Sequence, residues 1–156
     1  MKKSTAIIGV IFALISLSTS ADSFEQHTTP IYSGPSAKPN FQSLPGSINY
    51  RTMIRNRMKQ GVNFSGHYAI VTFGCGTGCK FTYLTDVKSG GIYDFPLSGE
   101  EYNKLWLDYR PDSKLIKASW AEGDFEEPIC VRQELVLKGV SFKLLNKTKT
   151  EGECDI

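Results

Sequence analysis

The stretch from residue 63 to residue 79 constrains the fold more than any other part of the chain, because it joins a strand-like run to a loop of glycines and cysteines. It begins Asn-Phe-Ser-Gly-His-Tyr, and residues 67–73 carry apolar side chains at both odd and even positions. That pattern is typical of a central strand covered on both faces. The strand leads into Gly-Cys-Gly-Thr-Gly-Cys, so we expect a tight loop at its end and any specialised site near it.

Residues 1–21 have the three parts of a secretory signal peptide. Lys2 and Lys3 form a positive start, residues 6–17 are apolar, and residues 18–21 are small, with cleavage expected after Ser20 or Ala21. The apolar run is too short to span a bilayer. We therefore predict export to the periplasm without stable insertion into the membrane.

The mature chain is expected to be electrically neutral and to form one domain. The sequence contains 18 Lys and Arg and 16 Asp and Glu, but two of the lysines lie in the predicted signal peptide. A neutral chain creates no overall field that attracts nucleic acid or an anionic membrane surface. The remaining residues, roughly 135, are enough for a single core. We divide them into an extended, partly ordered arm at 22–46, rich in Pro and Ser, and one α+β domain at 47–156.

The four cysteines, Cys75, Cys79, Cys130 and Cys154, are expected to form two disulfides in an oxidising compartment. Three pairings are possible. We favour Cys75–Cys79, which are close together in a glycine loop, and Cys130–Cys154, because the chain after the last hairpin can fold back to Cys130. The alternative joins one of the loop cysteines to Cys130.

The remaining pattern predicts one helix followed by short antiparallel strands. The helix is expected at 49–60, with Ser47 or Asn49 as its cap and Gly61 at its end. Residues 98–107 are ambiguous and could start a short helix. Strands are expected at 67–73, 81–87, 92–95, 114–121, 131–137 and 140–145. The predicted fold is an antiparallel β-meander of five or six strands with the N-terminal helix packed on it, stabilised by disulfides.

The glycine–cysteine loop has a structural interpretation and several chemical ones. A thiol–disulfide catalyst separates its cysteines by two residues and opens a helix, whereas here three residues intervene and a strand follows. Cys75, Cys79 and His67 are possible metal ligands, but export favours oxidised cysteines. We therefore interpret the loop as a disulfide-pinned turn and His67 as a hydrogen-bonded residue, and predict no catalytic residues, no metal and no cofactor.

Seven residues are candidates for contact with a partner. Two belong to the central stretch, two are tryptophans that could form a platform for a sugar or a protein, and three form an acidic loop that could face a basic partner. In a small domain, aromatic residues more often belong to the core, and acidic loops are more often simply solvated. The candidates are His67, Thr77, Trp106, Trp120, Asp124, Glu126 and Glu127.

Residues 63–68 followed by residues 74–79 resemble a set of small exported bacterial proteins of unassigned function. These proteins carry a similar Asn-Phe-x-Gly-His-Tyr segment, a strand, and a Gly-Cys-Gly-x-x-Cys segment. The resemblance extends from the predicted helix through Pro111-Asp-Ser-Lys-Leu-Ile to Cys130 and the final hairpin. It implies no established chemistry, so it transfers no catalytic role to any residue.

Together these features favour a non-enzymatic periplasmic binding protein. The most concrete version is an immunity or inhibitor protein that neutralises a toxin acting on the cell envelope, for example on peptidoglycan, so the expected partner is a toxin or an envelope enzyme. One alternative is an envelope protein that is structural or binds a glycan on its aromatic residues. The other is a redox or hydrolytic enzyme that uses His67 with a thiol.

Overall fold

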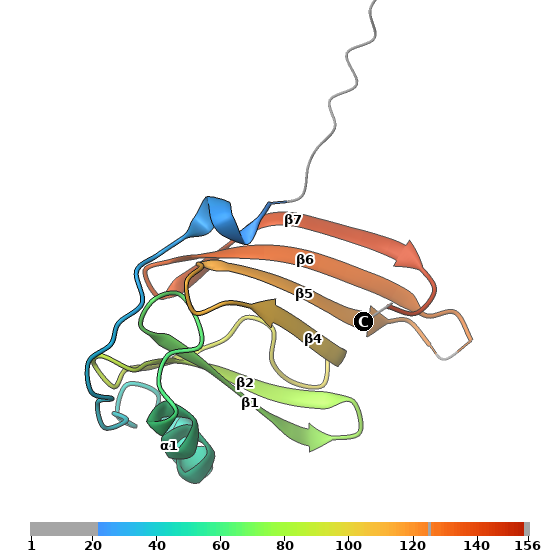
Figure 1. Cartoon of the computed structure of the whole chain (residues 1–156). Coiled ribbons are helices and arrows are strands. Elements are labelled where there is room, and N and C mark those ends of the chain that lie inside the picture. The colour runs from blue at the N-terminus through green and yellow to red at the C-terminus, as the bar shows by residue number, and fades with distance from the viewer. Residues whose placement is uncertain (1–21, 125, 155–156) are drawn as a thin grey trace, which may run out of the picture.

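The computed structural model describes residues 22–124 and 126–154, and the predicted signal peptide lies outside them. The described chain is an α+β fold with two antiparallel sheets and one α-helix (Figure 1). The three-stranded sheet consists of β1 (Tyr68–Gly76), β2 (Cys79–Asp86) and β3 (Ile92–Asp94). The four-stranded sheet consists of β4 (Asn103–Tyr109), β5 (Leu115–Glu122), β6 (Ile129–Lys138) and β7 (Ser141–Glu151).

The prediction of a single meander was wrong, although each sheet is a meander by itself, with its strands adjacent in chain order. The regular pairing of β3 with β2 ends at Asp94, shortly before Pro96, which cannot donate a ladder hydrogen bond, and beyond it, among the described residues, only Gly99 forms a bridge with Lys80 of β2. On either side of Pro96, Phe95 and Leu97 are buried in the core that also contains residues of β4–β6. These anchors carry the chain to the second sheet. Residues 103–107 of the ambiguous segment then belong to β4 rather than to a helix.

The predicted helix is divided into two parts. A 3-10 helix, η2 (Pro45–Tyr50), runs into α1 (Arg51–Lys59). Neither Ser47 nor Asn49 caps α1, because both lie inside η2, and the Ser47 hydroxyl instead donates to the carbonyl of Leu44 at 2.6 Å. Gly61 follows the helix at φ +84°, with its N–H donating to the Met58 carbonyl, as predicted for a glycine at a helix end.

Two apolar clusters hold the layers together. The larger lies between the sheets and includes Phe64, Ile70, Leu84, Ile116 and Trp120. The smaller joins α1 to the first sheet through Ile54, Met58, Val71 and Ile92. The helix therefore covers one face of the three-stranded sheet, and the four-stranded sheet covers the other.

The arm before the domain is extended and runs along the body of the molecule, as the blue segment of Figure 1. It begins with a short 3-10 turn, η1 (Phe24–His27), beside the four-stranded sheet, where Thr28 forms a bridge with Ser113. Further along, backbone N–H groups of Tyr32, Ala37 and Asn40 donate to carbonyls of the first sheet's loops at 2.6–2.8 Å. The arm is thus part of the folded unit.

Both predicted disulfides are confirmed. Cys75 pairs with Cys79 and Cys130 pairs with Cys154, with Cα–Cα distances of 5.2 and 4.9 Å. These bonds are compatible with a protein exported to an oxidising compartment. No helix of residues 22–124 and 126–154 is long and apolar enough to cross a membrane.

Candidate functional site

Residues 74–78, which are the end of β1 and the turn that leads into β2, are called the hairpin tip here. The Cys75–Cys79 disulfide closes it, and the β1–β2 register shifts between Gly74 and Gly76, which is a bulge. Gly74, Gly76 and Thr77 are exposed, whereas Cys79 is buried. The tip therefore presents backbone and one threonine side chain to solvent on a cross-linked frame.

The hairpin tip is also anchored to β4. Lys104 N–H donates to the Gly78 carbonyl at 2.9 Å, and Lys80 Nζ donates to the Leu105 carbonyl at 2.6 Å. Gly78 has φ +73°, and a Cβ at this position would lie 2.1 Å from Oδ1 of Asn103. The exposed end of the Asn103 side chain can move aside, so the positive φ is what makes glycine the residue suited to this position. The disulfide and these bonds hold the tip in one conformation.

Next to the hairpin tip, four partly exposed rings form a cluster that we call the aromatic patch. The rings of Tyr50 and Phe73 are 4.7 Å apart between centroids, and the other neighbouring pairs are 5.7–6.1 Å apart. The patch consists of Tyr50, Phe73, Phe81 and Tyr83. It joins the end of η2 to the exposed half of the β1–β2 hairpin.

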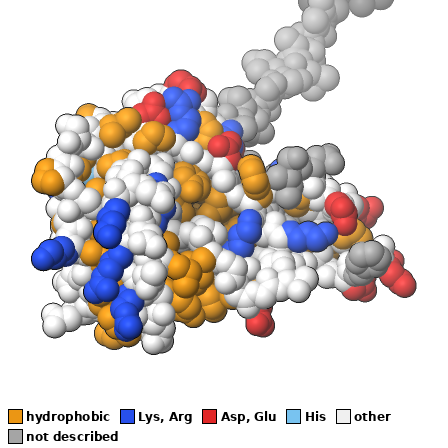
Figure 2. All heavy atoms as spheres, turned by 60° about the horizontal axis from the view of Figure 1, so that its bottom comes forward, with side chains coloured by type: hydrophobic (Ala, Val, Ile, Leu, Met, Phe, Trp, Pro, Cys, Tyr) orange, Lys and Arg blue, Asp and Glu red, His pale blue; other side chains and the backbone are white. Residues whose placement is uncertain are grey.

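The helix beside the aromatic patch carries only positive charge. Helix α1 contains four cationic residues and no acidic residue, and three of the cations, Arg51, Arg55 and Lys59, are exposed. Figure 2 shows Lys and Arg side chains in a row next to apolar side chains on this side of the molecule. None of the ion pairs found among the described residues involves α1. The row is therefore available to an acidic partner.

His67 belongs to the support of a turn. Its Nδ1 lies 2.9 Å from Oδ1 of Asp86, and its ring packs against that of Tyr68 at a tilt of 33°, with centroids 4.1 Å apart. Asp86 also accepts hydrogen bonds from the N–H groups of Lys88 and Ser89 and from the Ser89 hydroxyl. Burial by itself raises the pKa of Asp86, but the hydrogen bonds from Ser89, His67 and the two N–H groups outweigh it and hold the pKa below its ordinary value.

A reaction that pairs His67 with a cysteine thiol would need a free thiol. All four cysteines are in disulfides, and no free cysteine occurs in the part of the chain that the structure describes. A disulfide sulfur is neither the thiolate nucleophile nor the thiolate ligand that redox or metal chemistry requires. Within residues 22–124 and 126–154, no three His, Cys, Asp or Glu side chains are grouped to hold a metal ion.

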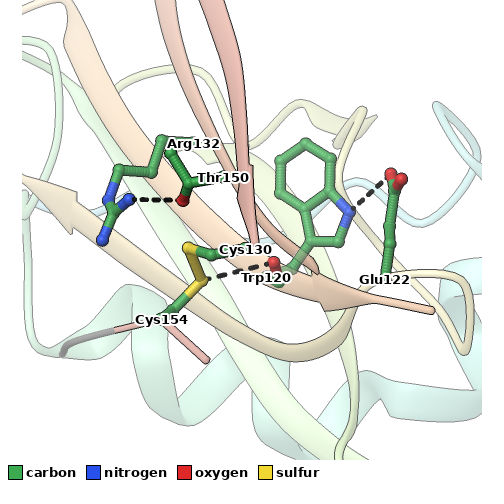
Figure 3. Close-up of a disulfide and its surroundings, with 6 residues drawn as sticks. All are labelled: Trp120, Glu122, Cys130, Arg132, Thr150 and Cys154. Carbon is green, nitrogen blue, oxygen red and sulfur yellow. Dashed lines mark hydrogen bonds between the residues drawn. A yellow bond between two sulfur atoms is a disulfide. The ribbon is translucent and has the colours of Figure 1, made fainter. Parts of the chain in front are cut away.

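The two tryptophans have different environments. Trp120 is 2% exposed and belongs to the core between the sheets, so its candidacy as a surface contact is corrected. Its indole N–H donates to Glu122 Oε1 at 3.2 Å, and its carbonyl oxygen lies 3.4 Å from Cys154 Sγ (Figure 3). Trp106, in contrast, is 50% exposed. A tryptophan is amphipathic enough to serve in either place, so sequence alone does not separate them.

The three acidic candidates lie in the β5–β6 loop. Asp124 Oδ1 accepts hydrogen bonds from the N–H groups of Glu126 and Glu127 at 3.1 and 2.8 Å, which is an Asx turn. Glu126 and Glu127 are exposed at the end of the molecule. Asp124 thus shapes the loop, and the two glutamates project into solvent.

A second surface, on the outer face of the four-stranded sheet, is called the trough. It has a volume of about 370 Å³ and is lined by side chains of all four strands. The strand register arranges these side chains in two rows across the sheet. One row is Trp106, Ser119, Arg132 and Thr148. The next is Asp108, Lys117, Glu134 and Asn146.

Sequence reasoning missed the trough except for Trp106. The signal that exists is the alternation in β5 and β6, where Lys117 and Ser119, and Arg132 and Glu134, occupy every second position. Alternation assigns these residues to one face within each strand. It does not give the register between strands, and the register is what places Lys117 beside Glu134 and Ser119 beside Arg132.

A scan of protein-family models and searches of curated proteins and of solved structures found no match to this chain. Its function is therefore inferred from the chemistry of the hairpin tip and the trough.

Proposed function

We propose that this is an exported, non-enzymatic binding protein that inhibits another protein, most concretely an immunity protein against a toxin of the cell envelope. The observation that carries the proposal is the hairpin tip, an exposed loop that a disulfide and bonds to β4 hold in one conformation. A loop already fixed in its bound conformation loses little conformational entropy on binding. Such a loop suits insertion into the cleft of a partner.

The surroundings of the hairpin tip supply the usual anchors of a protein interface. Affinity at such interfaces is concentrated in a few aromatic and arginine side chains. The aromatic patch provides partly exposed tyrosine and phenylalanine rings, and α1 adds Arg51 and Arg55 beside it. The tip, the aromatic patch and the helix cations together make one candidate binding surface.

The charge of this surface favours an acidic partner. The cations of α1 have no acidic residue on their own helix, so they attract and orient a surface of opposite charge. Enzymes that cleave glycosidic bonds, as in peptidoglycan, use a pair of carboxyl groups in their cleft. A toxin of this class would offer the negative cleft that a cationic surface with a protruding loop complements.

Site-specific cross-linking tests the proposal. A photo-reactive residue is placed at position 77 in the exported protein, and at position 148 in a matched control, because Thr77 and Thr148 are both exposed threonines, the first in the β1–β2 turn and the second on β7. A partner captured from position 77 is purified and assayed on isolated peptidoglycan as the mature protein is added. We expect stoichiometric inhibition of its activity.

Two arginine variants make the inhibition test specific. Thr77→Arg adds bulk at the hairpin tip and should abolish inhibition, whereas Thr148→Arg should leave it intact. The proposal fails if position 77 captures nothing, or if the captured protein stays fully active at saturating inhibitor.

A further inference from the structure

We propose that the trough is a binding site for a neutral saccharide of one or two sugar units. The proposal is independent of the proposed inhibition, because the trough and the hairpin tip lie on different sheets. It starts from Trp106, a half-exposed indole that lines a depression whose other lining residues, apart from Ala118, are polar. A large aromatic ring at the wall of a polar depression offers the apolar face that the C–H side of a sugar ring contacts.

The backbone before Trp106 is unusual in a way that sets the direction of its side chain. The β4–β5 register shifts between Asn103 and Trp106, and Lys104 has φ +55°. A bulge re-aims the side chains that follow it, and bulges are common beside binding sites. Leu105, inside the shifted segment, is buried in the core, and Trp106, where the pairing resumes opposite Ser119, lies on the outer face of the sheet. The indole is thus held at the trough by the backbone of β4.

The floor of the trough is polar, and not all of its hydrogen-bonding groups have a partner within the protein. Ser119 and Glu134 are each 9% exposed, and Glu134 Oε1 lies 3.3 Å from Lys117 Nζ. Among the described residues, the Ser119 hydroxyl has no hydrogen-bond partner. It is not sealed inside the protein, because no fully buried side-chain oxygen or nitrogen of these residues lacks a partner. It is therefore free to bond a solvent molecule or a ligand in the trough.

Chain segments border the trough at both ends. At one end, the Asp22 N–H donates to Glu134 Oε2 at 3.4 Å, and Lys117 Nζ lies 5.8 Å from the centroid of the Phe24 ring. At the other end, Cys130 follows the row of Arg132 on the same face of the sheet. Its disulfide to Cys154 brings the C-terminal segment onto the sheet (Figure 3). The trough is thus a bounded depression rather than an open sheet face.

Charge and size select the ligand class. The trough contains two acidic residues, Asp108 and Glu134, and two basic residues, Lys117 and Arg132. The balance gives no net attraction for a phosphate or a polyanion, but it supplies acceptors and donors for hydroxyl groups. The volume of about 370 Å³ is at the small end of the range of roughly 300–1,000 Å³ for small-molecule sites. A neutral, hydroxyl-rich ligand of one or two rings meets these conditions.

Titration of the mature protein with neutral sugars tests the proposal. The probes are cellobiose, maltose, lactose and the disaccharide of N-acetylglucosamine, with glucose 6-phosphate as the anionic comparison. Binding is measured by ligand-detected NMR and by intrinsic fluorescence, to which only Trp106 and Trp120 contribute as tryptophans. We expect at least one neutral disaccharide to bind and the anionic sugar to bind more weakly.

Variants then locate the site. Trp106→Ala should weaken binding at least about tenfold, and Val140→Ala, which removes an exposed apolar side chain elsewhere, should leave it unchanged. Ser119→Asn, which fills the floor with a larger polar group, should also weaken binding. Circular dichroism checks that each variant is folded. Thr77→Arg should keep sugar binding, so failure of the inhibition proposal and failure of this one are distinguishable.

The proposal is overturned by any of three results. None of the neutral sugars binds; binding is the same in Trp106→Ala; or the anionic sugar binds more tightly than all of the neutral ones. Capture of a protein by a photo-reactive residue at position 106, with no sugar binding, would assign the trough to a protein contact instead.

Discussion

The two disulfides should stabilise the protein by different amounts because they close loops of different length. Cys130 and Cys154 are 24 residues apart in sequence, whereas Cys75 and Cys79 are 4 apart. A cross-link restricts the unfolded chain more when the loop that it closes is longer. The chain-entropy relation gives about 3.5 kcal/mol for the longer loop and about 2 kcal/mol for the shorter one at 25 °C.

The burial of the cysteines should increase this difference in stability. Cys130 is 1% exposed and Cys79 is 7% exposed. Replacing both members of a pair by alanine removes sulfur atoms, and the cavity left at Cys130 adds to the loss of free energy there. We therefore expect Cys130→Ala/Cys154→Ala to be less stable than Cys75→Ala/Cys79→Ala by about 1.5 kcal/mol or more.

Urea unfolding of the mature protein and of both double variants measures this difference. Unfolding is followed by far-UV circular dichroism. The free energies of unfolding are compared between variants for which the free energy depends on urea concentration with a similar slope. Intact mass after alkylation confirms that each variant keeps its other disulfide. The reasoning is refuted if removing the Cys75–Cys79 bond is as destabilising as removing the Cys130–Cys154 bond, since loop length would then not decide the effect.

Four substitutions test the assignment of particular residues. The pKa of Asp86 is lower in the folded protein than its ordinary value of 3.8, so ionised Asp86 stabilises the fold above pH 3.8. This stabilisation is lost as the pH falls through the lowered folded-state pKa. Asp86→Asn should therefore be less stable near neutral pH, and its free energy of unfolding in urea should change less between about pH 5 and pH 2. Trp120→Ala should reduce the free energy of unfolding by about 3–5 kcal/mol, whereas the exposed Trp106→Ala should change it by less than about 1 kcal/mol. Gly78→Ala should lower the free energy of unfolding by about 1–2 kcal/mol, because its φ of +73° is strained for a residue with a Cβ.

The local features of the fold were predictable because their signals are close together in sequence. The Cys75–Cys79 bond follows from its spacing, and the β6–β7 hairpin follows from two alternating runs around Lys138-Gly139. Gly139 has φ +64° in that turn, as a tight hairpin requires. Each of these structures is decided within a few residues.

The division into two sheets was not predictable, because it depends on where the short segment after β3 packs. Residues 94–102 have no regular period, and their place is decided by Phe95 and Leu97 packing into the core. The following strand was hidden as well, since Ser98 and the two glutamates after it resemble a helix start. The bulge at Lys104 then interrupts the alternation of β4.

The trough was not predictable for a related reason. Trp106 and Trp120 both lie in strands, and their sequence neighbours do not tell which one faces the core. The outcome depends on the pairing of β4 with β5, where Trp106 is opposite Ser119 rather than Trp120. A register one residue different would exchange the two faces.

Strand β4 connects the two proposed surfaces, which determines how they can be separated by mutation. Lys104 N–H bonds the hairpin tip at Gly78, and two residues later Trp106 lines the trough. A change that loosens the tip, such as loss of the Cys75–Cys79 bond, can therefore move the β4 bulge and alter the trough as well. Thr77 is exposed and lies outside the bonds to β4. Thr77→Arg thus perturbs the tip alone, and an effect of this variant on sugar binding would mean that the bulge transmits changes between the two sheets.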